Sequence, residues 1–106
     1  MSHISQTYSL DVAVASGRVV LALFSAKWCT AGKVLDTQIQ PLLSTEVMYK
    51  YIDVDLDPYT ADYHKVVSLP TALLFVSGEQ QAKMHGSFST KDLVCEIEKS
   101  LTRKAG

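Results

Sequence analysis

Cysteine is scarce in this chain of 106 residues, where Cys29 and Cys95 are the only two. Small secreted domains that depend on disulfides carry several spaced cysteines, and structural zinc sites carry them in close pairs. Two isolated cysteines fit neither pattern. The sequence therefore argues against a disulfide framework. We expect no metal or other cofactor, and a reducing, cytoplasmic setting.

Long apolar runs are absent as well. No segment approaches the roughly 20 apolar residues that a helix needs to cross a bilayer. The first residues, 1–6, contain no basic start followed by an apolar stretch. We therefore expect neither a membrane span nor a secretory signal.

The chain also lacks an excess of charge of either sign. Its 10 Lys and Arg residues balance 11 Asp and Glu residues, the net charge is -1, and 47% of the residues are hydrophobic. A protein that binds polyanions carries a basic excess, and a disordered chain carries few apolar residues. We expect a single folded domain over residues 1–106, with no nucleic-acid partner.

Strands are predicted in four places. The apolar runs at 19–24 and 72–76 show no alternation of polar and apolar residues, which is typical of strands covered on both faces. Strand-forming residues also occupy 48–55. After a turn at 77–79, a hairpin partner follows at about 81–85.

Helical patterns at 8–16, 31–44 and 59–66 separate these strands, and a last helix begins near Ser89. Pro41 lies inside the second pattern, so we expect a kink or a fresh start there. Helix and strand alternate until the closing hairpin. This order predicts an α/β fold, with helices on both faces of the sheet.

The last helix carries its own start signal, because Ser89 and Asp92 form an acidic variant of the capping box. The residues that share its apolar face are Leu93, Val94, Ile97 and Leu101. Cys95 points away from that face, so we expect it to be exposed. We expect a monomer, and an exposed Cys95 would allow a disulfide-linked dimer under oxidising conditions.

Cys29 stands where the first apolar run has ended and a helical pattern begins. Unpaired backbone N–H groups and the positive end of the helix dipole both favour a thiolate at such a junction. Cys29 is therefore the candidate nucleophile. A redox dithiol would have its second cysteine at position 32, where the chain has Gly32.

Residues 24–33, FSAKWCTAGK, resemble the active-site segment of the thioredoxin family. Residues 53–58 are similar to the segment after the family's third strand, and 67–71 resemble the loop that bears its cis-proline. Residues 75–79 look like the hairpin turn that follows. Gly86 falls where thioredoxins place a glycine beside the active site.

These motifs occur in family order from about His3 to Leu101. The resemblance implies a thioredoxin-like three-layer fold with a central mixed β-sheet between helices. It also implies thiol–disulfide exchange with protein disulfides, and a cis peptide bond between Leu69 and Pro70.

The chain departs from the family at four places. Gly32 replaces the resolving cysteine, and Thr30-Ala31 replaces the usual Gly-Pro between the two cysteines. Leu23 corresponds to the buried aspartate that serves proton transfer, and Tyr51 corresponds to the lysine that often accompanies it. The resolving thiol and its proton-transfer pair are therefore lost together.

This combination predicts weak or no dithiol reductase activity. Cys29 can still attack a protein disulfide or a glutathione mixed disulfide, and glutathione, another external thiol or a reductase then completes the cycle. Cys95 is not expected to replace the missing thiol. We expect the Cα atoms of Cys29 and Cys95 to lie farther apart than the separation of about 7 Å that a disulfide tolerates.

The resemblance also implies a surface that binds substrate around Cys29. The backbone beside Pro70 would pair with an extended peptide as an added strand. The residues predicted to form this surface are Trp28, Thr30, Ala31, Val67, Leu69, Pro70 and Gly86.

Three alternatives remain open at this point. In the first, the chain is a non-catalytic module that recognises an extended peptide or a partner protein. In the second, Gly32 is an engineered replacement in an ordinary dithiol protein. In the third, Cys29 is a small, partly buried residue with no exchange role.

Other residues that attract attention have ordinary interpretations. His3, His64 and His85 lack the spacing of metal ligands, so we interpret them as surface histidines. The aspartates of 53–57 lack the glycine and terminal glutamate of a calcium loop. We interpret them as a solvated strand end.

Overall fold

The computed structural model describes residues 10–105, and the predictions for residues 8 and 9 and for His3 lie outside them. Four strands form one sheet in the order β2 (Val47–Asp53), β1 (Val19–Ser25), β3 (Thr71–Val76) and β4 (Glu79–His85). Strand β1 pairs in parallel with β2 and antiparallel with β3, and β3 pairs antiparallel with β4. The predicted mixed sheet is confirmed.

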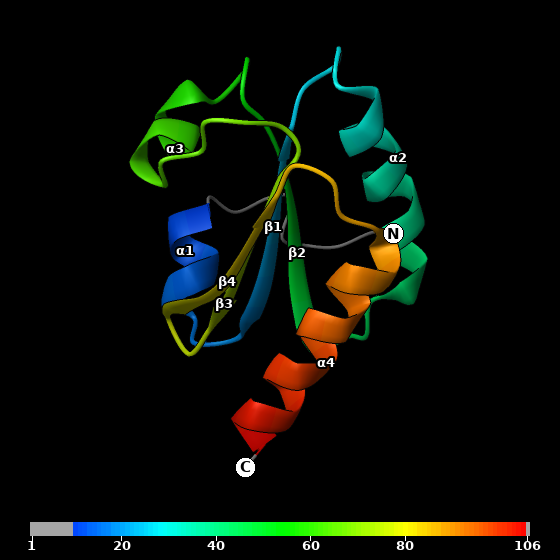
Figure 1. Ribbon diagram of the computed structural model, residues 1–106. Helices are drawn as coiled ribbons and strands as arrows, with labels where there is room; N and C mark the ends of the chain where they lie inside the picture. Colours follow the sequence, from blue (N-terminus) through cyan, green and yellow to red (C-terminus); the bar gives the residue numbers. More distant parts are fainter. Residues whose placement is uncertain (1–9, 106) are drawn as a thin grey trace.

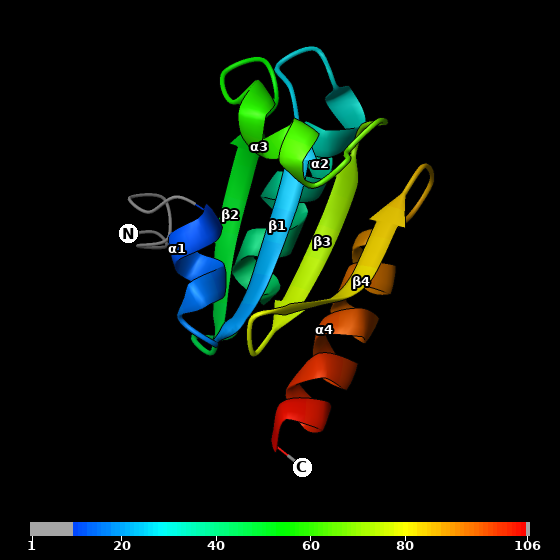
Figure 2. The same ribbon diagram turned by 90° about the vertical axis from the view of Figure 1, so that its left-hand side faces the viewer.

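Helices cover both faces of this sheet. Figure 1 shows α1 (Leu10–Ala15) and α3 (Pro58–Tyr63) on one side, and α2 (Thr30–Ile39) and α4 (Thr90–Ala105) on the other. In Figure 2 the first pair lies in front of the strands. The three-layer α/β architecture is therefore confirmed. In the described part of the chain, no helix is long and apolar enough to cross a membrane.

Strand β1 lies at the centre of the core because every one of its residues is buried. Leu21 and Leu23 belong to the cluster that also contains residues of α2 and α4, whereas Val20 and Phe24 belong to the cluster on the α1 and α3 side. Each fully buried side chain of this size contributes about 1.5–3 kcal/mol. Packing on both faces explains why the sequence of β1 shows no polar alternation.

Two segments end earlier than the sequence pattern predicts. Helix α2 stops at Ile39, and a 3-10 turn over Gln40–Leu42 follows, with Pro41 in its first turn. This outcome matches the predicted fresh start at the proline. Strand β2 stops at Asp53, whose carbonyl accepts hydrogen bonds from the N–H groups of Leu56 and Asp57.

Helix α3 is also shorter than predicted. Lys65 has a left-handed φ of 57°, and the N–H of Val66 donates to the carbonyl of Ala61 at 2.9 Å. This geometry closes the helix and satisfies a terminal carbonyl, a role that glycine usually has. The lysine gives no such signal in the sequence.

The capping box of α4 is confirmed. The N–H of Ser89 donates to the carboxylate of Asp92 at 2.9 Å, and the N–H of Asp92 donates to Ser89 Oγ at 3.1 Å. The backbone hydrogen bond, supported by the Ser89 side chain, lowers the pKa of Asp92. The start of α4 is therefore held by two reciprocal bonds.

The interpretation of His64 as a surface histidine is wrong. The residue is half-buried, and its ring centroid lies 5.5 Å from that of Phe75, 6.2 Å from that of Phe24 and 4.9 Å from that of Tyr63. Its Nε2 atom is buried and has no hydrogen-bond partner among the described residues. Desolvation lowers the pKa of His64, and the nearby carboxylate of Asp11 opposes that shift.

This environment makes stability depend on pH. Because the folded state binds the His64 proton less readily than the unfolded chain does, stability should fall as the pH drops below the unfolded histidine value of about 6.5. Urea unfolding at pH 7.5 and 5.5 measures the loss. We expect a shallower loss in H64Q, and the wild-type loss in H85Q, which alters an exposed histidine. Equal pH dependence in H64Q and the wild type would contradict this assignment.

Candidate functional site

Cys29 lies between β1 and α2, as the sequence predicts, at the carboxyl end of β1 (Figure 1). It is the N-cap residue of α2, with extended backbone angles (φ -93°, ψ 91°). Its N–H donates to the carbonyl of Ala26 at 3.0 Å, and its carbonyl accepts from the N–H of Lys33 at 3.1 Å. Only 8% of the residue is exposed. The thiol is therefore held at the start of a ten-residue helix.

Gly32 is buried in the first turn of α2, against the last residue of β1. A Cβ atom added to Gly32 would lie 2.0 Å from Ser25 Oγ and 2.6 Å from Ser25 Cβ. The same Cβ position lies 3.3 Å from Cys29 Sγ. Because Ser25 is fully buried, its side chain fills the space that any side chain at position 32 would need.

The two positions that correspond to the family's proton-transfer pair are neighbours in the sheet. Leu23 of β1 pairs with Tyr51 of β2 in the parallel register. Leu23 is fully buried, and Tyr51 packs against the same core cluster from a partly buried position. Neither side chain is a carboxylate or an amine, so the charged pair that the resemblance implies for the family is absent from these two positions.

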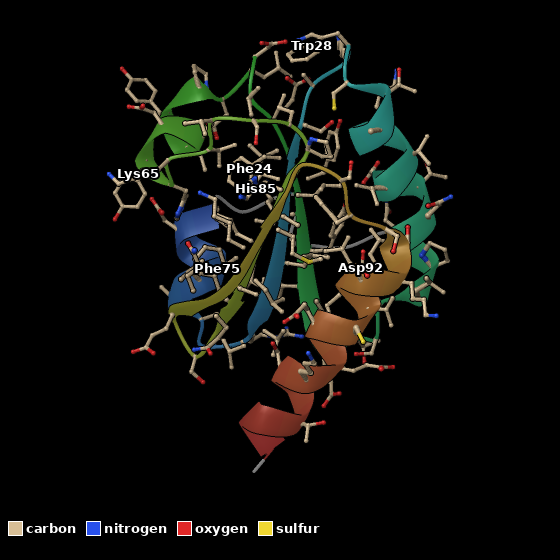
Figure 3. The ribbon with its side chains drawn as sticks, in the orientation of Figure 1. Phe24, Trp28, Lys65, Phe75, His85 and Asp92 are labelled. Atoms are coloured by element: carbon tan, nitrogen blue, oxygen red, sulfur yellow. The ribbon has the colours of Figure 1, made fainter. Side chains whose placement is uncertain are left out.

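Trp28 extends into solvent from the loop before Cys29, at the top of the view in Figure 3. It is 68% exposed, and its indole Nε1 donates to the carboxylate of Asp55 at 2.9 Å. This contact was missed when the aspartates were interpreted only as a solvated strand end. The available signal was the parallel order of the strands, because the carboxyl ends of β1 and β2 lie at the same edge.

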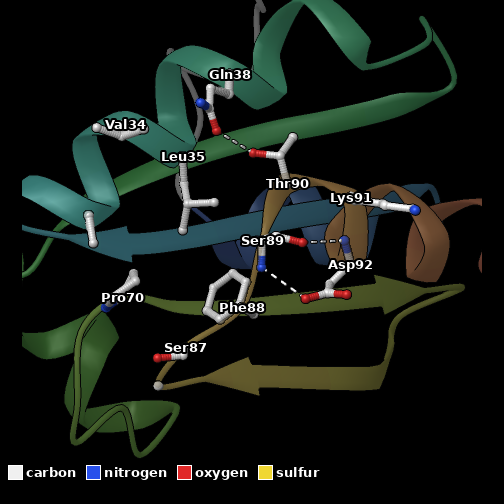
Figure 4. Close-up of a pocket in the computed structure, with 12 residues that line it drawn as sticks. Val34, Leu35, Gln38, Pro70, Ser87, Phe88, Ser89, Thr90, Lys91 and Asp92 are labelled. Carbon is white, nitrogen blue, oxygen red and sulfur yellow. Dashed lines mark hydrogen bonds between the residues drawn. The ribbon is translucent and has the colours of Figure 1, made fainter.

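A groove of about 810 Å³ lies between α2 and the start of α4 (Figure 4). Three of the residues predicted to bind substrate line it, namely Ala31, Pro70 and Gly86. The Leu69–Pro70 peptide bond beside the groove is cis. The other predicted residues, and Cys29 itself, are not among its lining residues.

These remaining positions differ in exposure. Val67 is 92% exposed, Thr30 is exposed and Leu69 is half-buried. The structure therefore divides the predicted surface. One part lines the groove, and the other lies outside it.

Sequence reasoning missed most of the groove lining, which comes from the rest of α2 and from the segment between Gly86 and the first turn of α4. Gln38 of α2 and Thr90 of α4 meet across the groove, where Thr90 Oγ1 donates to Gln38 Oε1 at 2.7 Å (Figure 4). Val34, Ser87 and Phe88 also line the groove. These residues come from distant segments, and no local pattern marks them.

Both cysteines are free, and Cys95 is exposed as predicted, whereas Cys29 is buried. Within residues 10–105, no group of three or more His, Cys, Asp or Glu side chains gathers in a way that could hold a metal ion. The chemically distinctive group at this site is therefore the thiol of Cys29.

A comparison with protein families decides the membership of the chain, since the model of the family described as Thioredoxin matches residues 2–99. The chain belongs to the thioredoxin family of thiol–disulfide oxidoreductases. Thioredoxin Y1, a chloroplastic protein of Arabidopsis thaliana, is 30% identical over 97 residues, which are 89% of this chain and 56% of that protein.

Other thioredoxins match over more of their own length. The thioredoxin of Chlamydia muridarum is 36% identical over 89 residues, covering 81% of this chain and 85% of that protein. The solved structure of a mutant thioredoxin from Halobacterium salinarum has a TM-score of 0.78 and 33% identity, and it covers 86% of this chain and 81% of that one. The expected thioredoxin-like fold is confirmed.

The close contact at Gly32 predicts that a thioredoxin-like dithiol cannot be restored by one substitution. Replacing glycine inside a helix usually stabilises a protein by about 0.5–1 kcal/mol. Here we expect G32C to lower the free energy of unfolding by about 1–3 kcal/mol, because the new side chain overlaps Ser25. Urea unfolding under reducing conditions measures this change.

Two double variants provide the control. S25G/G32C removes both atoms that overlap the new Cβ, and it should recover most of the lost stability. S25A/G32C keeps the Cβ atom of residue 25 at 2.6 Å from the added Cβ, and it should recover less. If G32C alone were as stable as the wild type, the proposed steric exclusion would be wrong.

The Trp28–Asp55 hydrogen bond can be tested by fluorescence, because the chain has a single tryptophan. In D55A the indole loses its hydrogen-bond partner, so we expect faster quenching of its fluorescence by acrylamide. The free energy of unfolding should stay within about 1 kcal/mol of the wild-type value. D62A removes another exposed aspartate, and acrylamide should quench its tryptophan fluorescence at the wild-type rate. Identical quenching in D55A and the wild type would show that the bond does not restrain the ring.

Proposed function

We propose that this thioredoxin-family protein exchanges disulfides through Cys29 alone, in a reducing compartment such as the cytoplasm. The observation that carries the proposal is the position of the Ser25 side chain, which a Cβ atom at the resolving position, residue 32, would overlap. The position of Cys29 at the N-terminus of α2 supports its role as the nucleophile, because the helix dipole favours negative charge there.

The proposed reaction has two exchange steps. The thiolate of Cys29 attacks one sulfur of a substrate disulfide, the substrate S–S bond breaks, and one substrate half leaves as a thiolate. A new S–S bond now joins Cys29 to the other half. An external thiolate, such as that of glutathione, attacks the substrate sulfur of this bond and releases Cys29 as a thiolate. One disulfide enters and one leaves, so there is no net oxidation of the protein.

The surroundings of Cys29 support particular roles in binding. The exposed face of Trp28 and the half-buried Leu69 offer an apolar edge for the substrate chain. We propose that the groove that begins at Ala31 and Pro70 accepts substrate residues adjacent to the disulfide.

A test of this function uses glutathione disulfide and mass measurement. Reduced C95S protein should gain one glutathione at Cys29, and C29S/C95S should gain none. The folded protein should react faster than the same protein unfolded in urea, because only the folded chain has the helix N-terminus. An absence of adduct, or equal rates in both states, would overturn the proposal. Insulin reduction with a thioredoxin reductase should be weak or nil.

A second candidate function is a non-catalytic binding module. The apolar Leu23–Tyr51 pair favours it, since proton transfer has no charged group at these positions. Binding of a peptide or a partner protein that is unchanged in C29S would favour the module. Loss of covalent exchange in C29S, with the fold intact, would favour the monothiol function.

A further inference from the structure

Ser25 is a buried hydroxyl that the proposed reaction does not yet use. The residue is fully buried at the carboxyl end of β1. Within the described chain, the one hydrogen bond of its hydroxyl goes to the carbonyl of the adjacent Ala26, at 3.5 Å. That distance is at the outer limit for a hydrogen bond, so the hydroxyl is only weakly satisfied.

The Ser25 hydroxyl and the Cys29 sulfur both lie near the Cβ position of Gly32. Ser25 Oγ and Cys29 Sγ are 2.0 Å and 3.3 Å from a single point, the position of a Cβ atom on Gly32. The serine side chain therefore occupies the place of the missing side chain, and the sulfur lies at its edge. The serine oxygen is the polar side-chain atom nearest to the point.

The backbone holds the two side chains in this arrangement. Ser25 pairs with Asp53 in the parallel register, and its carbonyl accepts from the N–H of Val54 at 2.9 Å. Cys29 is fixed by the hydrogen bond of its N–H to Ala26. A rotation about the Cα–Cβ and C–O bonds of Ser25 would reorient the hydroxyl without moving either segment.

We propose that Ser25 is a positioning residue for exchange at Cys29, and that its hydroxyl donates a hydrogen bond to the sulfur whenever that sulfur carries negative charge. This inference rests on the proposed function. The hydroxyl keeps its proton and forms no covalent bond. It stabilises the thiolate before attack and again when the external thiol displaces Cys29 from the mixed disulfide. In the neutral mixed disulfide it returns to Ala26.

The role follows from what exchange chemistry needs. A sulfur leaves a disulfide faster when its thiolate is better stabilised. Hydrogen bonds to charged groups are stronger than those between neutral groups. With Gly32 and Leu23 in place of the family's thiol and aspartate, Ser25 is the polar side chain nearest to the position of the missing thiol.

The first measurement is the rate of Cys29 alkylation by iodoacetamide against pH, in a C95S background. In S25A the midpoint should move to higher pH by about half a unit to one unit, because the thiolate loses a donor. S25T retains the hydroxyl and should keep the wild-type midpoint. S100A removes a buried serine of α4 and should also keep it.

These variants separate hydrogen bonding from packing. An unchanged midpoint in S25A, or the same shift in S25T as in S25A, would overturn the proposal. Urea unfolding of each variant identifies a loss of folding. Because iodoacetamide needs no disulfide substrate, this measurement tests Ser25 even if the wild type fails to form the glutathione adduct.

The second measurement is the release of glutathione from the Cys29 mixed disulfide by added glutathione. We expect release to be slower in S25A by roughly three- to tenfold, and unchanged in S25T and S100A. Equal release rates in S25A and the wild type would contradict the role of Ser25 in releasing the thiolate.

Discussion

The contact between the last residue of β1 and the first turn of α2 decides which side chains fit beside Cys29. Strand β1 is buried on both faces, so its end cannot move without disturbing the core. Ser25 at that end packs where a side chain of residue 32 would otherwise lie, and Gly32 is the residue that fits. Cys29, one turn earlier, remains as the sole thiol at the junction.

This contact bears on how the second cysteine was lost. A single engineered replacement of a cysteine by glycine would leave a void, because the surroundings would still suit a larger side chain. Here Ser25 fills the space, and the Leu23–Tyr51 pair fills the place of the family's charged pair. The coordinated packing favours a long-divergent site over an engineered one.

Much of the fold could be predicted because its signals are local. The continuous apolar run of β1 reflects burial on both faces, and Pro41 and the Ser89–Asp92 capping box mark helix ends through their own backbone chemistry. The end of α3 could not be predicted in this way. Lys65 adopts a left-handed conformation there, and a lysine carries no local preference for it.

The candidate site could be predicted only where local sequence signals mark it. Cys29 could be placed at a strand-to-helix junction from sequence alone, whereas contacts between distant segments could not. Asp55 reaches Trp28 only because β1 and β2 run in parallel, and Thr90 meets Gln38 only once α2 and α4 pack together. Burial likewise gave His64 an environment that a lone histidine in the sequence does not reveal.

We propose that the protein forms a disulfide with its substrate and cannot release itself. The most direct measurement is the lifetime of a purified mixed disulfide between Cys29 and a small peptide thiol, followed by mass without any external thiol. We expect a complex that persists until glutathione is added and that then releases free, reduced protein. Spontaneous release of the peptide with formation of an intramolecular disulfide would contradict it.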